Sequence, residues 1–511
     1  MMTNQENKLS RRKFISLLAG SCAIGAVTLS GCSPVSDPSG TGWLPNQYRT
    51  QADFPVSVKG RVPLDPADPA IMRDDEKCIL CGQCIEACEK VQSVFGYYQL
   101  PIHNEFICVH CGQCALWCPT GSIRERDQVA EVLAAIDDPD KVVVAQPSPA
   151  TRVGLGEEFG LPAGTWVEGQ LATSMKEVGF DYAMDINFSA DLTVTEEAAE
   201  LVERVKNGGV LPQFTSCCPA WVKFVEYYYP ELIPHLSSAR SPISMHGPVI
   251  KTYFAKNYNI APEKILTVTL TPCVAKKFEI ARPEFQKGAV AKYYGNDELK
   301  DNDIILCARE YANLLRAKNI DFVNLPEGKF DPLCGMGSGG GLIFGNTGGV
   351  MEAAVRTAYY YITGNQPPAD LLKLDAVRGL DGIKKATVNI PGVGDITVAV
   401  AHGLSNARKL CEEVKSGKAD FQFMEVMACP GGCISGGGQP RTTVPPQDWV
   451  RQARIDTNYA KDASYSLRNC HDNPEIIDLY NNFIGEPLSH TAHELLHTSY
   501  YSRGDALDKK E

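Results

Sequence analysis

Two runs of four cysteines with the same spacing point to iron–sulfur chemistry. The first run is Cys78-x2-Cys81-x2-Cys84-x3-Cys88, and the second is Cys108-x2-Cys111-x2-Cys114-x3-Cys118, followed by Pro119. At this spacing three thiolates bind one [4Fe–4S] cluster, and the fourth reaches a second cluster. The pattern predicts one cluster on Cys78, Cys81, Cys84 and Cys118, and its twin on Cys108, Cys111, Cys114 and Cys88.

A pair of structural zinc sites is the alternative interpretation of these runs. Zinc usually takes paired C-x2-C ligands, and a third cysteine at the same spacing has no role in a tetrahedral site of four ligands. Gly82 and Gly112 allow each loop to close around the sulfurs. The two runs therefore favour electron transfer, and they say nothing about a substrate.

Five further cysteines gather in three segments rich in turn-forming residues. The segments are residues 215–221 with Cys217 and Cys218, residues 271–279 with Cys273, and residues 423–433 with Cys429 and Cys433. Each is expected in a loop at the end of a strand, where open α/β sheets place their ligand sites. Four of these cysteines suit one more [4Fe–4S] cluster and leave one thiol over. Separate buried cysteines would explain neither the clustering nor the Pro-Gly turns.

The elements that must position these loops alternate between strands and helices. Residues 142–145 and 265–270 have strand character, whereas residues 196–206 and 350–361 have helical character. This alternation predicts an α/β architecture with mainly parallel sheets.

The length, the cysteine count and the net charge indicate a multidomain metalloprotein rather than a nucleic-acid-binding protein. The chain has 511 residues, which suggests roughly three domains. Its 19 cysteines are clustered rather than scattered, so metal binding is favoured over disulfides. The net charge of −12 argues against nucleic acid and favours a basic protein partner.

The N-terminus resembles an export signal. Arg11 and Arg12 precede a modest apolar stretch, Ile15 to Leu29, which small residues make too polar for a typical membrane anchor. The pattern predicts export by the Tat machinery, which carries folded proteins with their cofactors. Leu29-Ser30-Gly31-Cys32 resembles a lipobox, so Cys32 is a candidate lipid anchor at the outer face of the cytoplasmic membrane or in the periplasm.

The three cysteine segments closely resemble the signature motifs of the [FeFe] hydrogenases, and the match extends from about residue 71 to the C-terminus. The resemblance implies an H-cluster, in which a [4Fe–4S] cube is joined to a diiron unit carrying CO, cyanide and azadithiolate. The implied ligands of the cube are Cys218, Cys273, Cys429 and Cys433, with Cys433 bridging to the diiron unit.

The same resemblance assigns roles around the diiron unit. Cys217 corresponds to the proton-carrying thiol, Lys276 to the donor to a cyanide ligand, and Met427 to a methionine that packs on the diiron unit. Ser148 and Pro149 fall at positions of the cyanide pocket. The implied proton path runs from Cys217 through Glu197, Ser237 and Glu200 to Arg204. Without the resemblance, the two glutamates and the arginine would be interpreted as an exposed helix face.

The implied fold is an α/β H-cluster domain of two lobes with mainly parallel sheets, plus a small α+β ferredoxin-like domain with two [4Fe–4S] clusters. The expected order is a leader (1–31), a linker (32–70), the ferredoxin-like domain (71–127), the H-cluster domain (128–441) and a small-subunit-like segment (442–511).

The sequence departs from the family pattern at a few positions. Thr271 replaces the usual methionine, residues 148–150 follow the cyanide-pocket pattern loosely, and Cys334 is an extra thiol expected near the diiron unit. We hypothesise that these changes tune hydrogen bonding to the cofactor, oxygen sensitivity or catalytic bias.

Two other motifs are interpreted as coincidental. His493-Glu494-x2-His497 matches the zinc-protease pattern, but it lies in the small-subunit-like segment, where a packing helix is expected. Gly335-x-Gly337-x2-Gly340 is not preceded by a strand, so dinucleotide binding is not expected. Its glycines are expected to allow close approach to an inorganic centre.

These features together predict an enzyme that interconverts H2 with protons and electrons. Its expected direction is H2 uptake, with a c-type cytochrome as acceptor and ferredoxin as the alternative. It would depend on hydrogenase maturation proteins. The alternatives are an H2 sensor and a hydrogenase-like iron–sulfur protein without turnover, although intact Cys217, Lys276 and Met427 argue for the enzyme.

Overall fold

The computed structural model describes residues 60–98 and 106–507, so the leader and most of the linker lie outside the described residues. The described part of a smaller unit consists of Gly60, Arg61 and Ile79–Gly82, and the larger unit contains all the elements below. In the described ranges, no helix is long and apolar enough to cross a membrane.

The cysteine-rich module combines a two-stranded antiparallel sheet with short helices. Strand β1 (Ile71–Arg73) pairs with β2 (Ile123–Glu125). Helix α2 (Gln83–Glu86) and helix α3 (Gln113–Leu116) occupy equivalent places in the two repeats. Both repeats also take positive φ at matching positions, 56° at Leu80 and His110. The repeated sequence therefore folds as a repeated backbone.

The first lobe of the large domain has a fully parallel sheet in the order β4-β3-β6-β7. Its strands are β3 (Val142–Pro147), β4 (Tyr182–Ala183), β6 (Ile265–Thr271) and β7 (Ile304–Cys307). Helices α4 (Val129–Ile136), α5 (Glu168–Val178) and α13 (Ala308–Ala317) pack on one face. Helix α8 (Pro242–Val249) lies on the other, so the strands are buried along nearly their whole length.

The second lobe has a mixed sheet in the order β5-β10-β9-β8. Its strands are β5 (Gln213–Phe214), β8 (Ile383–Ile390), β9 (Gly394–His402) and β10 (Phe423–Met427). Only the β8–β9 pair is antiparallel, and edge strand β8 alternates buried and exposed residues. Helices α7 (Pro219–Tyr228) and α16 (Leu404–Lys415) cover one face, and α15 (Gly349–Thr363) covers the other.

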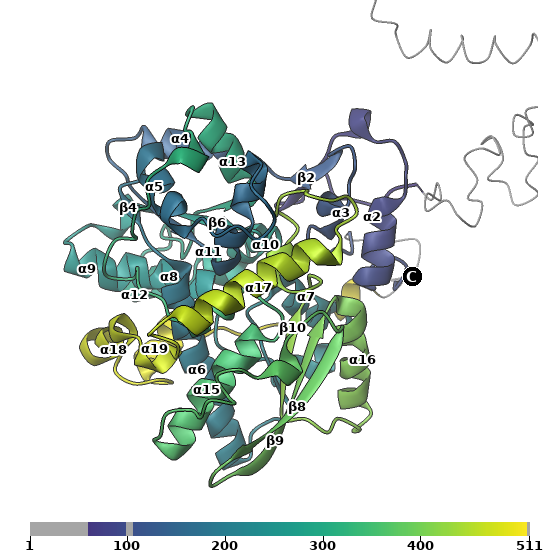
Figure 1. The fold of residues 1–511 in the computed structure, drawn as a ribbon, viewed down its shortest axis with the longest axis vertical. Coiled ribbons are helices and arrows are strands. Elements are labelled where there is room, and N and C mark those ends of the chain that lie inside the picture. The colour runs from purple at the N-terminus through teal and green to yellow at the C-terminus, as the bar shows by residue number, and fades with distance from the viewer. Residues whose placement is uncertain (1–59, 99–105, 508–511) are drawn as a thin grey trace, which may run out of the picture. The chain divides into compact units, whose positions relative to one another are not determined.

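Two long helices connect the lobes. Helix α6 (Ile186–Asn207) begins just after β4 and ends shortly before β5. Helix α17 (Asp448–Ser464) runs across the front of both lobes in Figure 1 and contacts the turns that follow β3 and β10. The helices not yet named are α9 (Ala255–Asn257), α10 (Ala275–Ile280), α11 (Pro283–Gln286), α12 (Ala289–Tyr294), α14 (Gly339–Ile343), α18 (Pro474–Leu479) and α19 (His490–Leu496).

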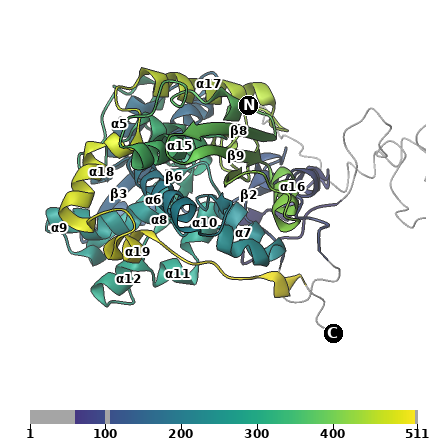
Figure 2. The ribbon, with the colours of Figure 1, turned by 90° about the horizontal axis from the view of Figure 1, so that it is seen from below.

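After α17 the chain passes through α18 and α19 on the first lobe, and then runs back toward α7 (Figure 2). The C-terminal segment therefore wraps both lobes. The predicted α/β class with mainly parallel sheets is confirmed.

Candidate active site

The candidate site lies where four parallel strands of the two lobes end. Strand β3 is followed by Ser148, β5 by Cys217 and Cys218, β6 by Cys273, and β10 by Cys429. Loops at the carboxyl ends of parallel strands form the ligand sites of open α/β sheets. In this chain the two lobes contribute such loops to one cavity.

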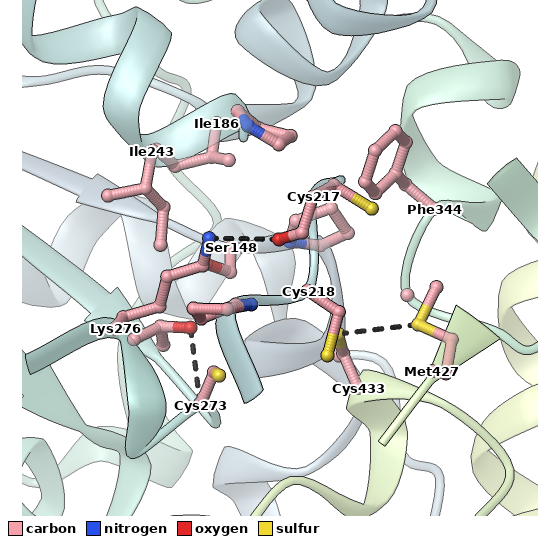
Figure 3. A pocket seen from close by; sticks show the side chains of 16 residues that line it. Ser148, Ile186, Cys217, Cys218, Ile243, Cys273, Lys276, Phe344, Met427 and Cys433 are labelled. Carbon is pink, nitrogen blue, oxygen red and sulfur yellow. Dashed lines mark hydrogen bonds between the residues drawn. The ribbon is translucent and has the colours of Figure 1, made fainter. Parts of the chain in front are cut away.

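The cavity brings together eight of the site residues singled out from the sequence (Figure 3). Its lining includes Ser148, Pro149, Cys217, Cys218, Cys273, Lys276, Met427 and Cys433. The departures Thr271 and Ala150 also line it, and Ile186, Ile243 and Phe344 add apolar surface. A mostly apolar wall with a few polar groups suits a small bound centre.

The four cysteines of the expected cube lie close together, with Cys429 buried and the other three partly buried. Cys218, Cys273 and Cys433 line the cavity, and the charges of all three act on buried Cys429. Burial raises the pKa of Cys273 to about 12 and also raises the pKa of Cys218. Such thiols need a cationic metal centre to become thiolates. The donor set therefore fits an iron–sulfur cube.

The loop between Cys429 and Cys433 depends on glycine. Gly431 and Gly432 have φ of 83° and 102°, a region that other residues rarely adopt. A Cβ on Gly432 would lie 2.6 Å from the amide nitrogen of Thr347. The Pro-Gly-Gly turn thus allows Cys429 and Cys433, which both follow β10, to face the same cluster site.

Lys276 is held at the cavity by hydrogen bonds. Its Nζ donates to the carbonyl oxygen of Cys217 (3.1 Å) and to Glu279 Oε2 (2.8 Å). The hydroxyls of Ser241 and Ser244 donate to that same oxygen at 2.9 and 3.0 Å. An ammonium has three hydrogens, so one is left to face the cavity. On the opposite wall, the sulfurs of Met427 and Cys433 lie 4.0 Å apart.

A line of polar side chains runs from Cys217 along α6. Glu197 is fully buried, and neither carboxylate oxygen has a hydrogen-bond partner in the described part of the chain. Burial and the charge of Glu200 raise its pKa well above the usual value. Burial, together with the charge of Glu197, likewise raises the pKa of the Cys217 thiol.

The outer half of this line is hydrogen-bonded. Ser237 donates to Glu200 Oε2 at 2.6 Å, and Arg204 donates to Glu200 Oε1 at 2.6 Å. Arg204 is partly exposed, so the line reaches the surface there. Over the described residues, no hydrogen bond joins Glu197 to Cys217 or to Ser237.

A second cavity is lined by one of the two cysteine sets of the small module. Cys88, Cys108, Cys111 and Cys114 all face it. Cys84 and Cys118 belong to the adjoining core, whereas Cys81 belongs to the smaller unit. The assignment of Cys78, Cys81, Cys84 and Cys118 to one cluster stays a prediction from the sequence.

Cys334 does not lie where the sequence suggested. It does not line the cavity, and its thiol is buried in a separate core cluster with Met184, Phe188 and Met245. Its backbone has a φ of 78° and accepts a hydrogen bond from the amide of Asp185. The expectation of a thiol beside the diiron unit is therefore wrong.

The glycine-rich segment after Cys334 approaches protein rather than an inorganic centre. A Cβ on Gly337 would lie 2.1 Å from Asn187, and one on Gly340 would lie 2.7 Å from the sulfur of Cys470. These glycines let α14 pack tightly between α6 and the C-terminal segment. The expected approach to an inorganic centre is thus not found at these two positions.

The second histidine of the His493-Glu494-x2-His497 motif lies just beyond its helix, and its ring is 4.5 Å from that of His493. Helix α19 ends at Leu496, and His497 is extended. The buried His497 ring lies 3.0 Å from Glu196 and 2.9 Å from the hydroxyl of Ser238. The histidine therefore ties the C-terminal segment to α6 through hydrogen bonds, which the helical spacing did not reveal.

Two sets of side chains around these cavities were not anticipated. Glu279 could have been found, because it lies three residues after Lys276 on α10. The contacts of His110 with Asp68 and Lys223 join three distant parts of the chain and leave no signal in the spacing.

Comparisons with known proteins agree with this geometry. Residues 141–437 match the family model described as "Iron only hydrogenase large subunit, C-terminal domain", and residues 448–503 match "Iron hydrogenase small subunit".

The similar proteins include two relatives and a solved structure. The NADP-reducing hydrogenase subunit HndD of Solidesulfovibrio fructosivorans is 43% identical over 85% of this chain and 75% of its own length. The periplasmic [Fe] hydrogenase large subunit of Nitratidesulfovibrio vulgaris is 44% identical over 75% of this chain and 90% of its own length. A solved apo [FeFe]-hydrogenase from Chlamydomonas reinhardtii is 39% identical, with a TM-score of 0.65 over 74% of this chain and 100% of that one. The chain therefore belongs to the [FeFe] hydrogenase family, whose members interconvert H2 with protons and electrons at an H-cluster.

Proposed function

We propose that this chain is an exported [FeFe] hydrogenase that oxidises H2 and passes the electrons to a c-type cytochrome. The observation that carries the proposal is the single cavity that Cys217, Lys276 and Met427 share with Cys218, Cys273 and Cys433. A protein that only carried electrons would not need a buried thiol and a buried ammonium beside its cluster ligands.

Cys218, Cys273, Cys429 and Cys433 would hold the cube, and Cys433 would hold the diiron unit as well. When bound, the H-cluster supplies an iron site that polarises H2 and an amine that takes up a proton. Lys276 would offer its third hydrogen to a cyanide ligand of the bound cofactor, because its other two are held by Cys217 and Glu279. Met427, Ser148 and Pro149 close the remaining wall.

Cys217 is the proposed first proton carrier of the protein. Its buried thiol keeps its proton at neutral pH and can exchange it with a base in the cavity. Burial and the charge of Glu200 raise the pKa of Glu197 well above its usual value, which favours a protonated carboxyl as the next group of the proposed path. From there the proposed path follows Ser237, Glu200 and Arg204, and the last two hydrogen bonds are already formed.

Electrons are proposed to leave through the small module. Cys108, Cys111, Cys114 and Cys88 face one cavity and would hold the cluster nearer to the H-cluster, since the charge of Cys111 acts on Cys429. Cys78, Cys81, Cys84 and Cys118 would hold the second cluster.

The leader sequence, the net charge and one relative support the proposed export and the proposed electron acceptor. The twin-arginine leader and Cys32 support Tat export with a lipid anchor, and one relative is named a periplasmic hydrogenase. A net charge of −12 favours a basic cytochrome over an acidic ferredoxin.

The test uses protein matured anaerobically with its diiron unit. Reduced viologen should yield H2, and H2 should reduce a basic c-type cytochrome faster than it reduces an acidic ferredoxin. Full iron loading without gas would overturn the enzymatic proposal. Preference for the ferredoxin would overturn the assignment of the acceptor alone.

A further inference from the structure

His110 joins two buried charges beside the cluster ligands of the small module. The residue stands between Cys108 and Cys111 in the second cysteine run. Its Nδ1 lies 2.9 Å from Asp68 Oδ2, and its Nε2 lies 2.8 Å from Lys223 Nζ. All three side chains are at most 7% exposed. An ammonium can only donate, so Nε2 accepts from Lys223, and the hydrogen of the neutral ring is on Nδ1, the nitrogen that lies close to Asp68.

The order of charges relative to the cluster is fixed by the fold. The ligating atoms of Asp68, Cys108 and His110 all lie within 4.8 Å of one another, and the amide of His110 donates to the sulfur of Cys108. Asp68 therefore lies directly against a cluster ligand, and Lys223 is attached behind the imidazole ring.

Aromatic packing holds this arrangement in place. The His110 ring stacks on the Phe278 ring, with 4.4 Å between the ring centres. Lys223 Nζ lies 4.2 Å from the centre of the Phe278 ring. Asp68 Oδ1 accepts the amide hydrogens of Ala70 and Ile71 at 2.8 and 2.9 Å. Neither charge can turn away without losing these contacts, so both act on the cluster at fixed distances.

A fixed negative charge lowers the reduction potential of a nearby redox centre, and a fixed positive charge raises it. Reduction of a [4Fe–4S] cluster adds one electron, here supplied by H2 oxidation and later passed to the external carrier. A nearby carboxylate disfavours that added charge, and a nearby ammonium favours it. Since both groups are buried, salt screens them little.

We propose that Asp68 and Lys223, joined through His110, form a charge pair that sets the reduction potential of the cluster held by Cys88, Cys108, Cys111 and Cys114. The inference rests on the proposed assignment of that cluster. Asp68 lowers the potential and Lys223 raises it, so the pair controls how easily electrons pass between the H-cluster domain and the small module.

The test is a redox titration of the full-length, matured protein, followed by the EPR signals of its reduced clusters. K223M should move one cluster signal to lower potential, and D68N should move the same signal to higher potential. The signal of the other ferredoxin-like cluster should stay in place. The conservative variant K223R keeps the charge and should keep the native potential.

K251M is the matched control, because Lys251 is another buried lysine paired with an aspartate, Asp303, and it lies in the large domain. It should leave both cluster potentials unchanged. Shifts of the same sign in K223M and D68N, or no shift in either, would overturn the charge-pair proposal while leaving the cluster assignment intact. A native protein with full iron but only one ferredoxin-like cluster signal would overturn the cluster assignment and this inference with it.

Discussion

Ser237 donates its hydroxyl hydrogen to Glu200 across 2.6 Å, inside a wall of the large domain where Ser237 is fully buried. The same carboxylate accepts a hydrogen bond from Arg204 at its other oxygen. Glu200 is thereby held between a buried hydroxyl and a partly exposed guanidinium. This geometry is what a proton path needs at its outer end.

Removal of that hydroxyl should slow turnover without unfolding the protein. S237A removes the hydroxyl that joins the buried part of the proposed proton path to Glu200, so H2 evolution should fall by roughly 10²-fold. S238A is the control, since the neighbouring hydroxyl bonds to His497 instead. Equal rates of H2 evolution in S237A and the native enzyme would show that Ser237 does not carry protons.

The Pro-Gly-Gly turn should be indispensable for loading of the cube. G432A places a Cβ 2.6 Å from a backbone nitrogen, so we expect loss of the iron of one cube. G394A is the matched control, because Gly394 has nearly the same φ (101°) but open space around it. That variant should lose about 1 kcal/mol of stability and keep its iron. Full iron content in G432A would contradict the prediction.

Glu425 should make stability depend on pH. Burial raises its pKa to about 7, although the amides of Gly348 and Met351 donate to it at 2.7 Å. The folded protein then keeps a proton that the unfolded chain loses near pH 4.5. This contribution to stability is complete below that pH and is lost as the pH rises through 7.

The measurement compares unfolding free energies of the native protein and E425Q from pH 5 to 8. The native value should fall relative to E425Q by up to about 3 kcal/mol over this range. E203Q, at an exposed glutamate, should follow the native profile. Parallel profiles for E425Q and the native protein would show that Glu425 titrates normally.

Thr271 should influence the direction of catalysis. It lines the cavity, and its hydroxyl accepts the amide hydrogen of Cys273 at 3.3 Å. T271M removes this hydroxyl and adds bulk beside the cofactor site, so the ratio of H2 oxidation to H2 evolution should change. Both rates should be measured on the same preparation with one dye pair. An unchanged ratio would mean that the substitution does not tune bias.

The sequence was sufficient for the strand ends and their cysteines, because ligand spacing and turn residues are local signals. In the structure, the loops that follow β5, β6 and β10 hold Cys217, Cys273 and Cys433, and all three line the cavity. Contacts between distant segments were not accessible in this way. Cys334 was misplaced because its neighbours in space, such as Met245, are far away in the sequence. The tie of His497 to Glu196 spans 301 residues and could not be inferred from helical spacing.

The most direct test concerns the buried thiol at the cavity. C217A should keep its iron and its diiron unit, which the CO and cyanide infrared bands report. Its rate of H2 evolution should nevertheless fall by roughly 10²-fold or more. C411A removes another buried thiol, on α16 and outside the cavity, and should retain native turnover. Collapse of turnover in C217A alone is the predicted result. Native rates in a fully loaded C217A would contradict the proton role of Cys217 and the mechanism built on it.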